Sequence, residues 1–333
     1  MNKKTIIIAE AGVNHNGRID YAIKLIDEAA NSGADYVKFQ HTNPDSISPR
    51  ARKAKYQIIN TKNSENQKTM ISKLHLDWDR AYKILLNRCK LKKIKFLTSA
   101  FNSNDFLIVN RLKPDFIKIP SGEIVNTELL ETISKSNKKI LLSTGMANNK
   151  EIENALKILT KSNSSKRITL LHCVSEYPTN FKDVNLQSIN FLRKKFKVAV
   201  GFSDHSLGIE APIAAVALGA TVIEKHFTLS KKMKGPDHKA SLDPEELCLM
   251  VSKIRNIEKA MGQLKKKPTK NELVTSYLVR QSIHAKTNIN KGERFNSKNI
   301  CLMRPYDGLP SHNLKKLYNK FSKKKFQKYD PIK

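Results

Sequence analysis

Lysine and serine residues stand at the ends of several short apolar runs in this sequence. Lys38 and Lys118 hold equivalent places near the ends of two of the runs, Ser143 ends another, and Ser121 and Ser203 closely follow runs. A buried ammonium group is costly unless an anion pairs with it. If the runs end on one face, two positive charges and three hydroxyls converge there, which predicts a phosphate or carboxylate site. The alternative is that the lysines extend to solvent and the serines cap helices.

Two histidines end neighbouring runs late in the chain. His205 and His226 lie at the ends of the seventh and eighth runs. Adjacent strands are roughly 5 Å apart, so both imidazoles can reach one divalent ion. Two imidazoles with carboxylates and water suit Mn²⁺, Fe²⁺, Zn²⁺ or Co²⁺. The alternative is that each is a hydrogen-bonded structural histidine.

Three carboxylates accompany these residues. Glu10 ends the first run in a glycine-rich turn, and Glu123 lies two residues past Ser121. Both are candidates for general bases or for hydrogen bonds to a polyol, and the alternative for each is an ion pair with a nearby lysine. Asp237 follows a Gly-Pro turn, where it can hold a metal-bound water or a hydroxyl, or simply start the turn.

The runs alternate with helical patterns over the first 262 residues. Each run is short, β-branched and apolar on both faces, as buried parallel strands are. Eight strand–helix units of this size predict a (β/α)₈ TIM barrel, with an open doubly wound sheet as the alternative. In a barrel the chemistry lies just after the strands, and the long polar segment 43–73 is expected to lie over the mouth. The predicted strands are Thr5–Ala9, Asp35–Phe39, Lys95–Thr98, Phe116–Ile119, Ile140–Ser143, Ile168–His172, Val198–Gly201 and Thr221–Glu224.

The alternation stops after Gly262. A lysine-rich stretch with a proline predicts a linker over 263–277, followed by a small module over 278–333. This module is expected to contain strands at Ser282–Ala285 and Ile300–Met303 and a basic helix near Asn313–Phe321. Its core would be marginal alone, so we expect support from the barrel or from a second subunit.

Composition narrows the classes of function. The 333 residues carry a formal net charge of +31, but the charge is spread along the chain, so we expect no specific nucleic-acid partner. No run reaches the ~18 apolar residues of a membrane span, and the first ten residues do not form a signal peptide. The 4 cysteines are widely spaced and form no CxxC motif, which favours a reducing, cytoplasmic setting.

Taken together, these motifs resemble the sialic acid (N-acetylneuraminate) synthase family over nearly the whole chain. The last module resembles the antifreeze-like (SAF) domain of that family. The matching segments, in chain order, are 10–17 (EAGVNHNG), 37–40 (VKFQ), 119–123 (IPSGE), 143–146 (STGM), 201–205 (GFSDH), 224–228 (EKHFT) and 235–242 (GPDHKASL).

The resemblance implies a transferase that condenses phosphoenolpyruvate with an N-acyl amino sugar. It implies Glu10 as the catalytic carboxylate and His205 and His226 as ligands of a divalent metal, usually Mn²⁺, with Mg²⁺ or Co²⁺ as substitutes. The implied phosphoenolpyruvate-binding residues are Lys38, Ser99, Lys118, Ser121, Ser143 and Ser203. The residues implied near the sugar or the metal-bound water are Gln40, Glu123, Tyr177, Asp237 and Arg304.

Arg304 matches the arginine that the SAF domain of one subunit inserts into the active site of the other, so the resemblance implies a domain-swapped homodimer. The implied product is N-acetylneuraminate from N-acetylmannosamine, and the alternative is legionaminate from 2,4-diacetamido-2,4,6-trideoxymannose. A more distant alternative is another metal-dependent barrel aldolase or synthase. The chain departs from the family pattern at Ala100, at Val174 with Ser175, and after Arg304 at Tyr306.

Overall fold

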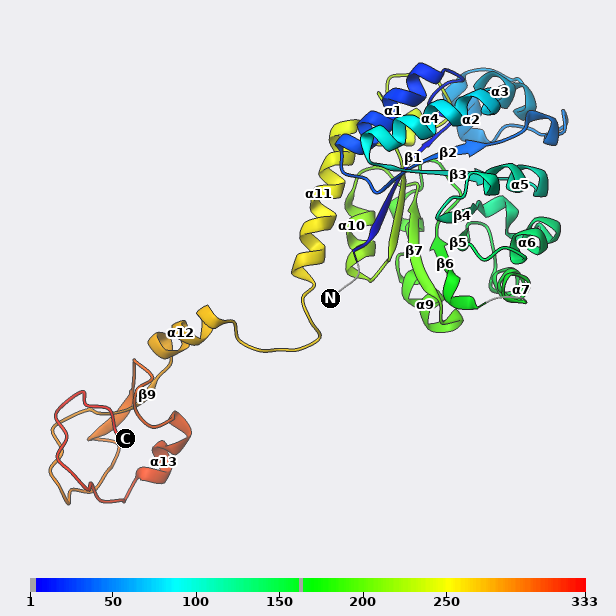
Figure 1. Cartoon of the computed structure of the whole chain (residues 1–333). Helices are drawn as coiled ribbons and strands as arrows, with labels where there is room; N and C mark the ends of the chain where they lie inside the picture. Colours follow the sequence, from blue (N-terminus) through cyan, green and yellow to red (C-terminus); the bar gives the residue numbers. More distant parts are fainter. Residues whose placement is uncertain (1–3, 162–163) are drawn as a thin grey trace. The chain divides into compact units, whose positions relative to one another are not determined.

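The first compact unit of the protein is a closed parallel β-barrel. The computed structural model describes residues 4–161 and 164–333, and it divides the chain into Met1–Gly262 and Gln263–Lys333. In the described part of the first unit, eight strands pair in sequence order and β8 closes on β1, which confirms the barrel over the open sheet (Figure 1). The strands are β1 Ile6–Gly12, β2 Tyr36–His41, β3 Lys95–Ala100, β4 Phe116–Ile119, β5 Lys139–Ser143, β6 Ile168–His172, β7 Ala199–Asp204 and β8 Val222–His226.

Amphipathic helices cover the outside of the barrel. In α1, Ala22, Leu25, Ile26 and Ala29 recur at helical spacing and are all buried against it. The covering helices are α1 Ile19–Asn31, α4 Trp78–Lys92, α5 Ser103–Arg111, α6 Thr127–Ser134, α7 Asn149–Thr160, α9 Gln187–Phe196, α10 Glu210–Ala217 and α11 Pro244–Ala260, with a short α8 at Phe181–Val184. In the described residues, no helix is long and apolar enough to cross a membrane.

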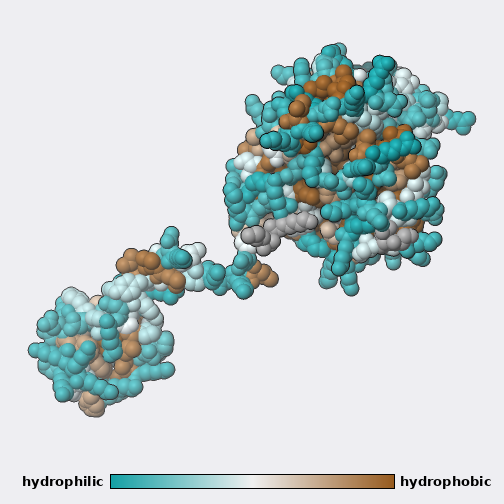
Figure 2. Space-filling view, in the orientation of Figure 1, coloured by the Kyte–Doolittle hydropathy of each residue, from teal (hydrophilic) through white to brown (hydrophobic). Residues whose placement is uncertain are grey.

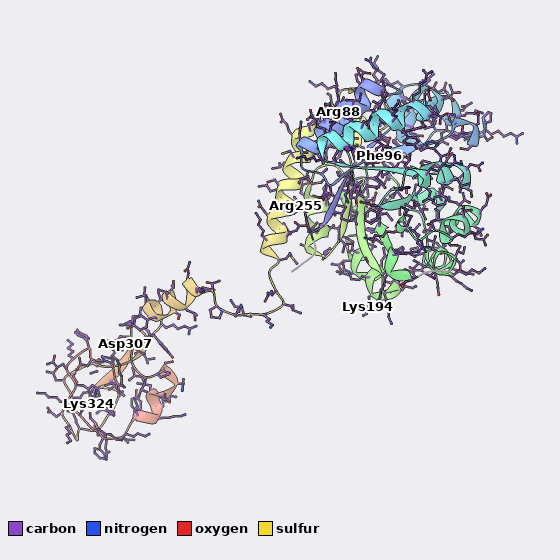
Figure 3. All side chains as sticks on the ribbon, in the orientation of Figure 1. Arg88, Phe96, Lys194, Arg255, Asp307 and Lys324 are labelled. Carbon is purple, nitrogen blue, oxygen red and sulfur yellow. The ribbon has the colours of Figure 1, made fainter. Side chains whose placement is uncertain are left out.

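Ion pairs fasten the outer layer. Arg255 of α11 donates to the carbonyl of Thr5 at 2.8 Å and to the carboxylate of Asp35 at 2.8 Å (Figure 3). The last helix of the barrel is thereby joined to the region where β1 and β2 begin. Arg88 of α4 similarly pairs with Asp27 of α1.

Inside the barrel, one apolar layer supports one polar layer. Strand side chains alternate between the two faces, so residues two apart point the same way. A buried apolar cluster fills the lower layer: Ile8, Tyr36, Leu97, Phe116, Leu141, Leu171 and Val222. Two positions farther along each of the same strands stand Glu10, Lys38, Ser99, Lys118, Ser143, Cys173 and Glu224. The strand ends therefore bring the polar residues together above an apolar floor.

The segment expected to lie over the mouth has its own structure. It holds a 3₁₀ turn at Pro44–Ser46, α2 Lys55–Thr61 and α3 Gln67–Leu74. Lys53 anchors it: the side chain is buried and donates to the hydroxyl of Thr61 at 2.8 Å. Asn60 of α2 also donates to the carbonyl of Pro236 at 2.6 Å, joining the segment to the loop after β8.

The second unit has a separate small core. Strands β9 Ser282–Ala285 and β10 Ile300–Met303 pair antiparallel, and the short helix α13 covers only Leu314–Leu317. The buried cluster here consists of Ile283, Ala285, Ile289, Phe295, Ile300, Phe326 and Ile332.

The expected linker is only partly a linker. Residues 263–269 form no helix or strand, but Lys270–Val279 form α12, whose start carries a capping box between Thr269 and Glu272. The predicted boundary at residue 278 therefore falls inside a helix. Within its own unit α12 buries no residue, and it exposes apolar side chains that form a patch in Figure 2: Leu273, Val274, Tyr277, Leu278 and Val279.

The residues between β7 and α10, which begins at Glu210, form no helix. Ser206 is held by Asp204 instead, which accepts from its backbone N–H at 2.9 Å and from its hydroxyl at 2.7 Å. Lys225 donates to the carbonyl of Ser206, so residues of both β7 and β8 hold Ser206 in place.

Gly201 of β7 stands in the apolar layer inside the barrel, where each of the other seven strands places a side chain. A Cβ there would lie 2.5 Å from the carbonyl oxygen of Val222 and 2.7 Å from Cδ2 of Leu171. We expect Gly201→Ala to lower the free energy of unfolding by about 2 kcal/mol, because overpacking shifts both neighbours. Urea unfolding measures this. Gly122→Ala is the control, since a Cβ at Gly122 meets nothing within 4 Å; equal stability of the two variants would contradict the packing described.

Candidate active site

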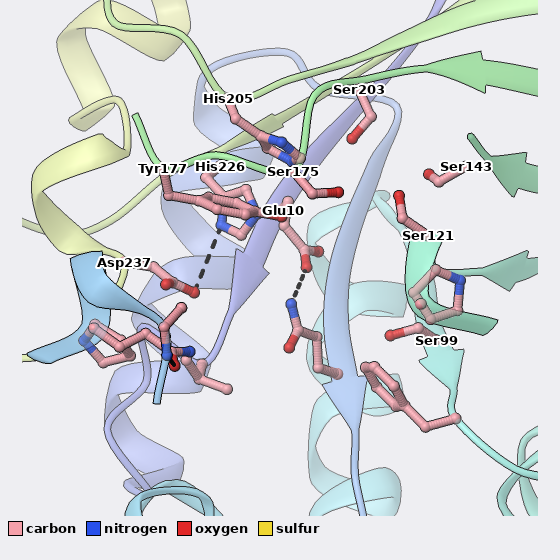
Figure 4. A pocket seen from close by; sticks show the side chains of 18 of the residues that line it. Glu10, Ser99, Ser121, Ser143, Ser175, Tyr177, Ser203, His205, His226 and Asp237 are labelled. Atoms are coloured by element: carbon pink, nitrogen blue, oxygen red, sulfur yellow. Dashed lines mark hydrogen bonds and ion pairs between the residues drawn. The ribbon is translucent and has the colours of Figure 1, made fainter. Parts of the chain in front are cut away.

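The polar layer of the barrel opens into a cavity of about 320 Å³. All eight strands supply lining residues from their carboxyl ends or the turns after them, and the segment 43–73 supplies one wall. In Figure 4, Ser99, Ser121 and Ser143 lie on one side, and Tyr177, His205 and His226 lie on the other.

Four buried charged groups form the floor of the cavity. Strand register pairs Glu10 with Lys38, and their side chains form an ion pair of 2.8 Å. The Glu224 carboxylate lies 3.4 Å from the Lys118 amine and 3.8 Å from the Lys38 amine. All four residues are between 1% and 4% exposed. We call this group the charge quartet.

Burial and pairing set the ionisation of the quartet. Burial lowers the pKa of Lys38, but the carboxylates of Glu10 and Glu224 outweigh it, so the pKa is raised overall. Burial raises the pKa of Glu224, and the two lysines reverse that and lower it. For Glu10, burial outweighs the nearby Lys38, so the pKa of its carboxyl is raised. For Lys118, burial outweighs the nearby Glu224, so the pKa of its amine is lowered. Glu10 is thus the carboxylate of the quartet most ready to take up a proton.

Hydroxyls and an amide surround the quartet. Lys118 donates to the hydroxyl of Ser143 at 2.9 Å, and Ser203 donates to Glu224 at 3.0 Å. Gln40 donates to Glu10 at 2.9 Å (Figure 4). The hydroxyl of Ser99 is buried and has no hydrogen-bond partner among the described residues. Two ammonium groups and these donors can receive an anion that carries several oxygens.

The two histidines stand beside the quartet. Their ring centroids are 5.6 Å apart. His205 Nδ1 donates to the carbonyl of Val174 at 2.5 Å, which leaves Nε2 with its lone pair. His226 Nδ1 is buried without a hydrogen-bond partner among the described residues and lies 4.0 Å from the Asp237 carboxylate.

These imidazoles fit a divalent metal as a partial ligand set. Burial lowers the pKa of His205 to about 4 and that of His226 well below its usual value, so both rings are neutral and their lone pairs are available. No group of three or more His, Cys, Asp or Glu side chains within residues 4–161 and 164–333 is arranged to hold a metal. Two nitrogens are fewer ligands than a divalent ion requires, so a metal held here would take its remaining ligands from substrate or water.

An aromatic and apolar wall closes the other side of the cavity. Tyr56 of α2 stacks on Tyr177, with ring centroids 5.0 Å apart, and Tyr177 lies 4.0 Å from the ring of His205. The other apolar side chains that line the cavity include Val13, Met70, Ile71, Phe101 and Met146. The segment 43–73 thus shapes the cavity as well as covering it.

Comparison with known proteins identifies the family. A family model described as the NeuB family matches residues 25–266. This chain belongs to the NeuB family. It is 49% identical to the N,N'-diacetyllegionaminic acid synthase of Campylobacter jejuni, over 99% of both chains. It is 41% identical to the enzyme of the same name from Legionella pneumophila, over 91% of this chain and 86% of that one.

A solved NeuB-type structure agrees with the fold. The chain resembles the N-acetylneuraminic acid synthetase of Leptospira borgpetersenii, crystallised in complex with citrate, with a TM-score of 0.73 and 35% sequence identity. The match covers 82% of this chain and 90% of that one. These findings confirm the expected family of nonulosonic acid synthases and remove the alternative of an unrelated barrel aldolase.

Most residues predicted for the NeuB site line the cavity. They are Glu10, Lys38, Gln40, Ser99, Lys118, Ser121, Ser143, Tyr177, Ser203, His205, His226 and Asp237. Glu123 does not: its carboxylate accepts from Asn126 at 2.7 Å in the turn after β4. Arg304 lies in the second unit, directly after β10.

Sequence reasoning missed two residues of the site. Glu224 lies in the matched segment 224–228, but the sequence analysis did not predict that it pairs with both lysines. Two buried lysines need a nearby carboxylate, and this was the signal that could have identified it. Tyr56 lies in a polar segment with no strand pattern around it, and only its aromatic character sets it apart from its neighbours.

Glu224→Gln removes the carboxylate that both lysines share. We expect the free energy of unfolding to fall by about 3 kcal/mol, because two buried ammonium groups are left with Glu10 alone. Chemical denaturation measures the loss. Glu153→Gln, on the exposed face of α7, is the control and should leave stability unchanged. If Glu224→Gln were as stable as Glu153→Gln, the Glu224 carboxylate would not compensate the charge of the two lysines.

Proposed function

We propose that this protein is an N,N'-diacetyllegionaminate synthase. It condenses phosphoenolpyruvate, water and 2,4-diacetamido-2,4,6-trideoxymannose into the nine-carbon acid and releases phosphate. The observation that carries this proposal is the cavity itself, in which an anion site of two lysines adjoins an apolar wall. The identity of 49% with the Campylobacter jejuni synthase, over nearly the full length of both chains, supports the same sugar.

The apolar wall favours the diacetamido sugar over N-acetylmannosamine. N-acetylmannosamine carries hydroxyls at C4 and C6, where the trideoxy sugar carries an acetamido group and a methyl group. A hydroxyl against Met70 or Ile71 would lose hydrogen bonds to water without replacement, whereas methyl groups gain from burial there. N-acetylneuraminate synthesis remains the second candidate, supported by the similarity to the Leptospira enzyme.

The charge quartet is the proposed phosphoenolpyruvate site. Lys38 and Lys118 would hold the phosphate and carboxylate groups, with hydroxyls from Ser99, Ser143 and Ser203 as further donors. The methylene carbon of phosphoenolpyruvate attacks the aldehyde carbon of the open-chain sugar, and positive charge develops at C2. Water adds to C2, and the resulting tetrahedral intermediate expels phosphate as its C–O bond breaks. The lysines stabilise the charge of the departing phosphate.

Glu10 is the proposed proton acceptor. Its carboxylate lies at the floor of the cavity between Lys38 and Gln40, and burial raises its pKa, which strengthens it as a base. It takes the proton of the water that adds to C2. His205 and His226 would hold a divalent ion, with Mn²⁺ as the expected metal, and such an ion supplies Lewis-acid polarisation of the sugar aldehyde.

A second copy of the chain is the proposed source of Arg304. The apolar side chains that α12 exposes need a cover, and a second barrel is the surface we propose for it. Arg304 would then meet the N-acyl group of the sugar in the partner's cavity, in a domain-swapped homodimer.

The proposed setting is the cytoplasm. Cys89, Cys173, Cys248 and Cys301 are all free thiols in the described structure. Reduced thiols are the normal state in that compartment.

The choice of sugar tests the function directly. With phosphoenolpyruvate and Mn²⁺, we expect faster phosphate release with 2,4-diacetamido-2,4,6-trideoxymannose than with N-acetylmannosamine, by at least about tenfold in kcat/KM. Mass spectrometry identifies the product. Preference for N-acetylmannosamine would make the protein an N-acetylneuraminate synthase, and no release with either sugar would overturn the proposal.

Glu10→Gln tests the proton acceptor. The amide keeps the size of the side chain but cannot take a proton, so we expect kcat to fall by about 100-fold or more while phosphoenolpyruvate still binds. Calorimetry measures binding and phosphate release measures turnover. Normal turnover in this variant would remove Glu10 from the mechanism.

Mixing two inactive variants tests the source of Arg304. Neither Glu10→Gln nor Arg304→Ala should turn over alone. In a mixed dimer, the barrel with an intact Glu10 receives Arg304 from its partner, so one of its two sites is complete. Random reassembly at equal concentrations should then restore about a quarter of normal activity. If activity does not return although mixed dimers form, Arg304 does not act across subunits.

A further inference from the structure

A second cavity lies at the opposite end of the barrel from the active site. Its volume is about 770 Å³, and Ile6, Tyr36, Phe116 and Val222 line it, each at the start of a barrel strand. Tyr36 and Phe116 stand two residues before Lys38 and Lys118 on the same strands. A single apolar layer therefore separates this cavity from the charge quartet, and the proposed reaction does not use it.

The charged residues around this cavity are almost all basic. Six lysines and Arg167 line it, against one acid, Asp115, whereas the whole chain has 61 basic and 30 acidic residues. Lys95 pairs with Asp115 at 2.6 Å, and Lys4 pairs with Asp35 at 2.8 Å. The basic residues are spread along the sequence, but the fold brings seven of them together around this cavity.

Arg167 holds part of the wall in place rather than facing a ligand. Its guanidinium donates to the backbone carbonyls of Lys138 at 3.1 Å and Leu159 at 2.9 Å. These bonds join the end of α7 to the turn before β5, where Lys138 and Lys139 follow one another.

Four lysines of the cavity form no close ion pair with a described residue, and of these Lys139 still lies near enough to Asp115 to interact with its charge. No carboxylate of the described residues lies within 4 Å of the amines of Lys113, Lys138, Lys139 and Lys166. Lysine amines that gather without acids repel one another, and an anion with several charges relieves that repulsion. Lysine acts as a point charge toward phosphate, so a chain of phosphates can contact several of these amines at once.

We propose that this end of the barrel is a binding site for a polyphosphate chain, either inorganic or part of a nucleotide. The unpaired lysines surround one cavity instead of forming a stripe along a surface, which fits a small ligand better than a nucleic-acid helix. The proposal is independent of the sugar that the active site uses, because binding is measured without turnover.

Calorimetry of the full chain with tripolyphosphate tests the site, with phosphoenolpyruvate present to occupy the active-site lysines. The test variant is Lys113→Glu with Lys139→Glu. The control is Lys83→Glu with Lys253→Glu, which changes the net charge equally at exposed positions in α4 and α11. At about 0.15 M salt, we expect the wild type and the control to bind alike and the test variant to bind at least about tenfold more weakly.

Equal affinity in all three proteins, or no binding to the wild type, would overturn the proposal. If the charge-reversed protein does not fold, Lys113→Gln with Lys139→Gln replaces it, and the same loss is expected. ATP titrated in parallel distinguishes the sources: tighter binding than tripolyphosphate identifies a nucleotide, and equal binding identifies the phosphate chain alone as the ligand. Both of these results support the site.

Discussion

Two buried lysines at the centre of the barrel constrain the rest of the molecule. Lys38 and Lys118 are each 3% exposed, and a buried ammonium group is tolerated only beside negative charge. Glu10 and Glu224 provide that charge, and strand register places Glu10 next to Lys38. Four ionisable groups therefore lie buried at the centre of the barrel, and their pairing offsets the cost of burying them.

This arrangement requires rigid neighbours. Two residues before each of the four charged residues, the same strand contributes a side chain to the apolar layer. This packed layer lies beneath the quartet and fills the barrel interior there. Above it, the serines, histidines and Tyr177 form the walls, and segment 43–73 forms the side that the strands leave open. If an anion binds here as proposed, the lysines are already held in place by Glu10 and Glu224, so little reorganisation is needed.

Much of this could be predicted from the sequence. The barrel follows from eight two-sided apolar runs, and the site follows because parallel strands in a barrel end on one face. Phe116–Ile119 and Ile168–His172 match the observed strands at both ends. The two lysines, the serines and the two histidines were therefore placed correctly in one cavity.

The remainder depends on contacts that one sequence does not reveal. The family resemblance implied Glu123 near the sugar, but Glu123 does not line the cavity and its carboxylate accepts from Asn126 in the turn. Tyr56 reaches the site because Lys53 and Asn60 anchor the segment that carries it, and both anchors are long-range or buried contacts within a polar stretch. The lysines of the second cavity are scattered in sequence and meet only at the starts of the strands.

The proposed mechanism depends most on the addition of water to C2 of a phosphoenolpyruvate molecule that the charge quartet holds. Phosphoenolpyruvate labelled with ¹⁸O in the oxygen that joins C2 to phosphorus tests this directly. If water adds to C2 and the C–O bond breaks, all of the label leaves with inorganic phosphate. Label retained in the sugar acid would mean that the P–O bond breaks instead, and it would contradict both the roles of Glu10 and the proposed path to the product.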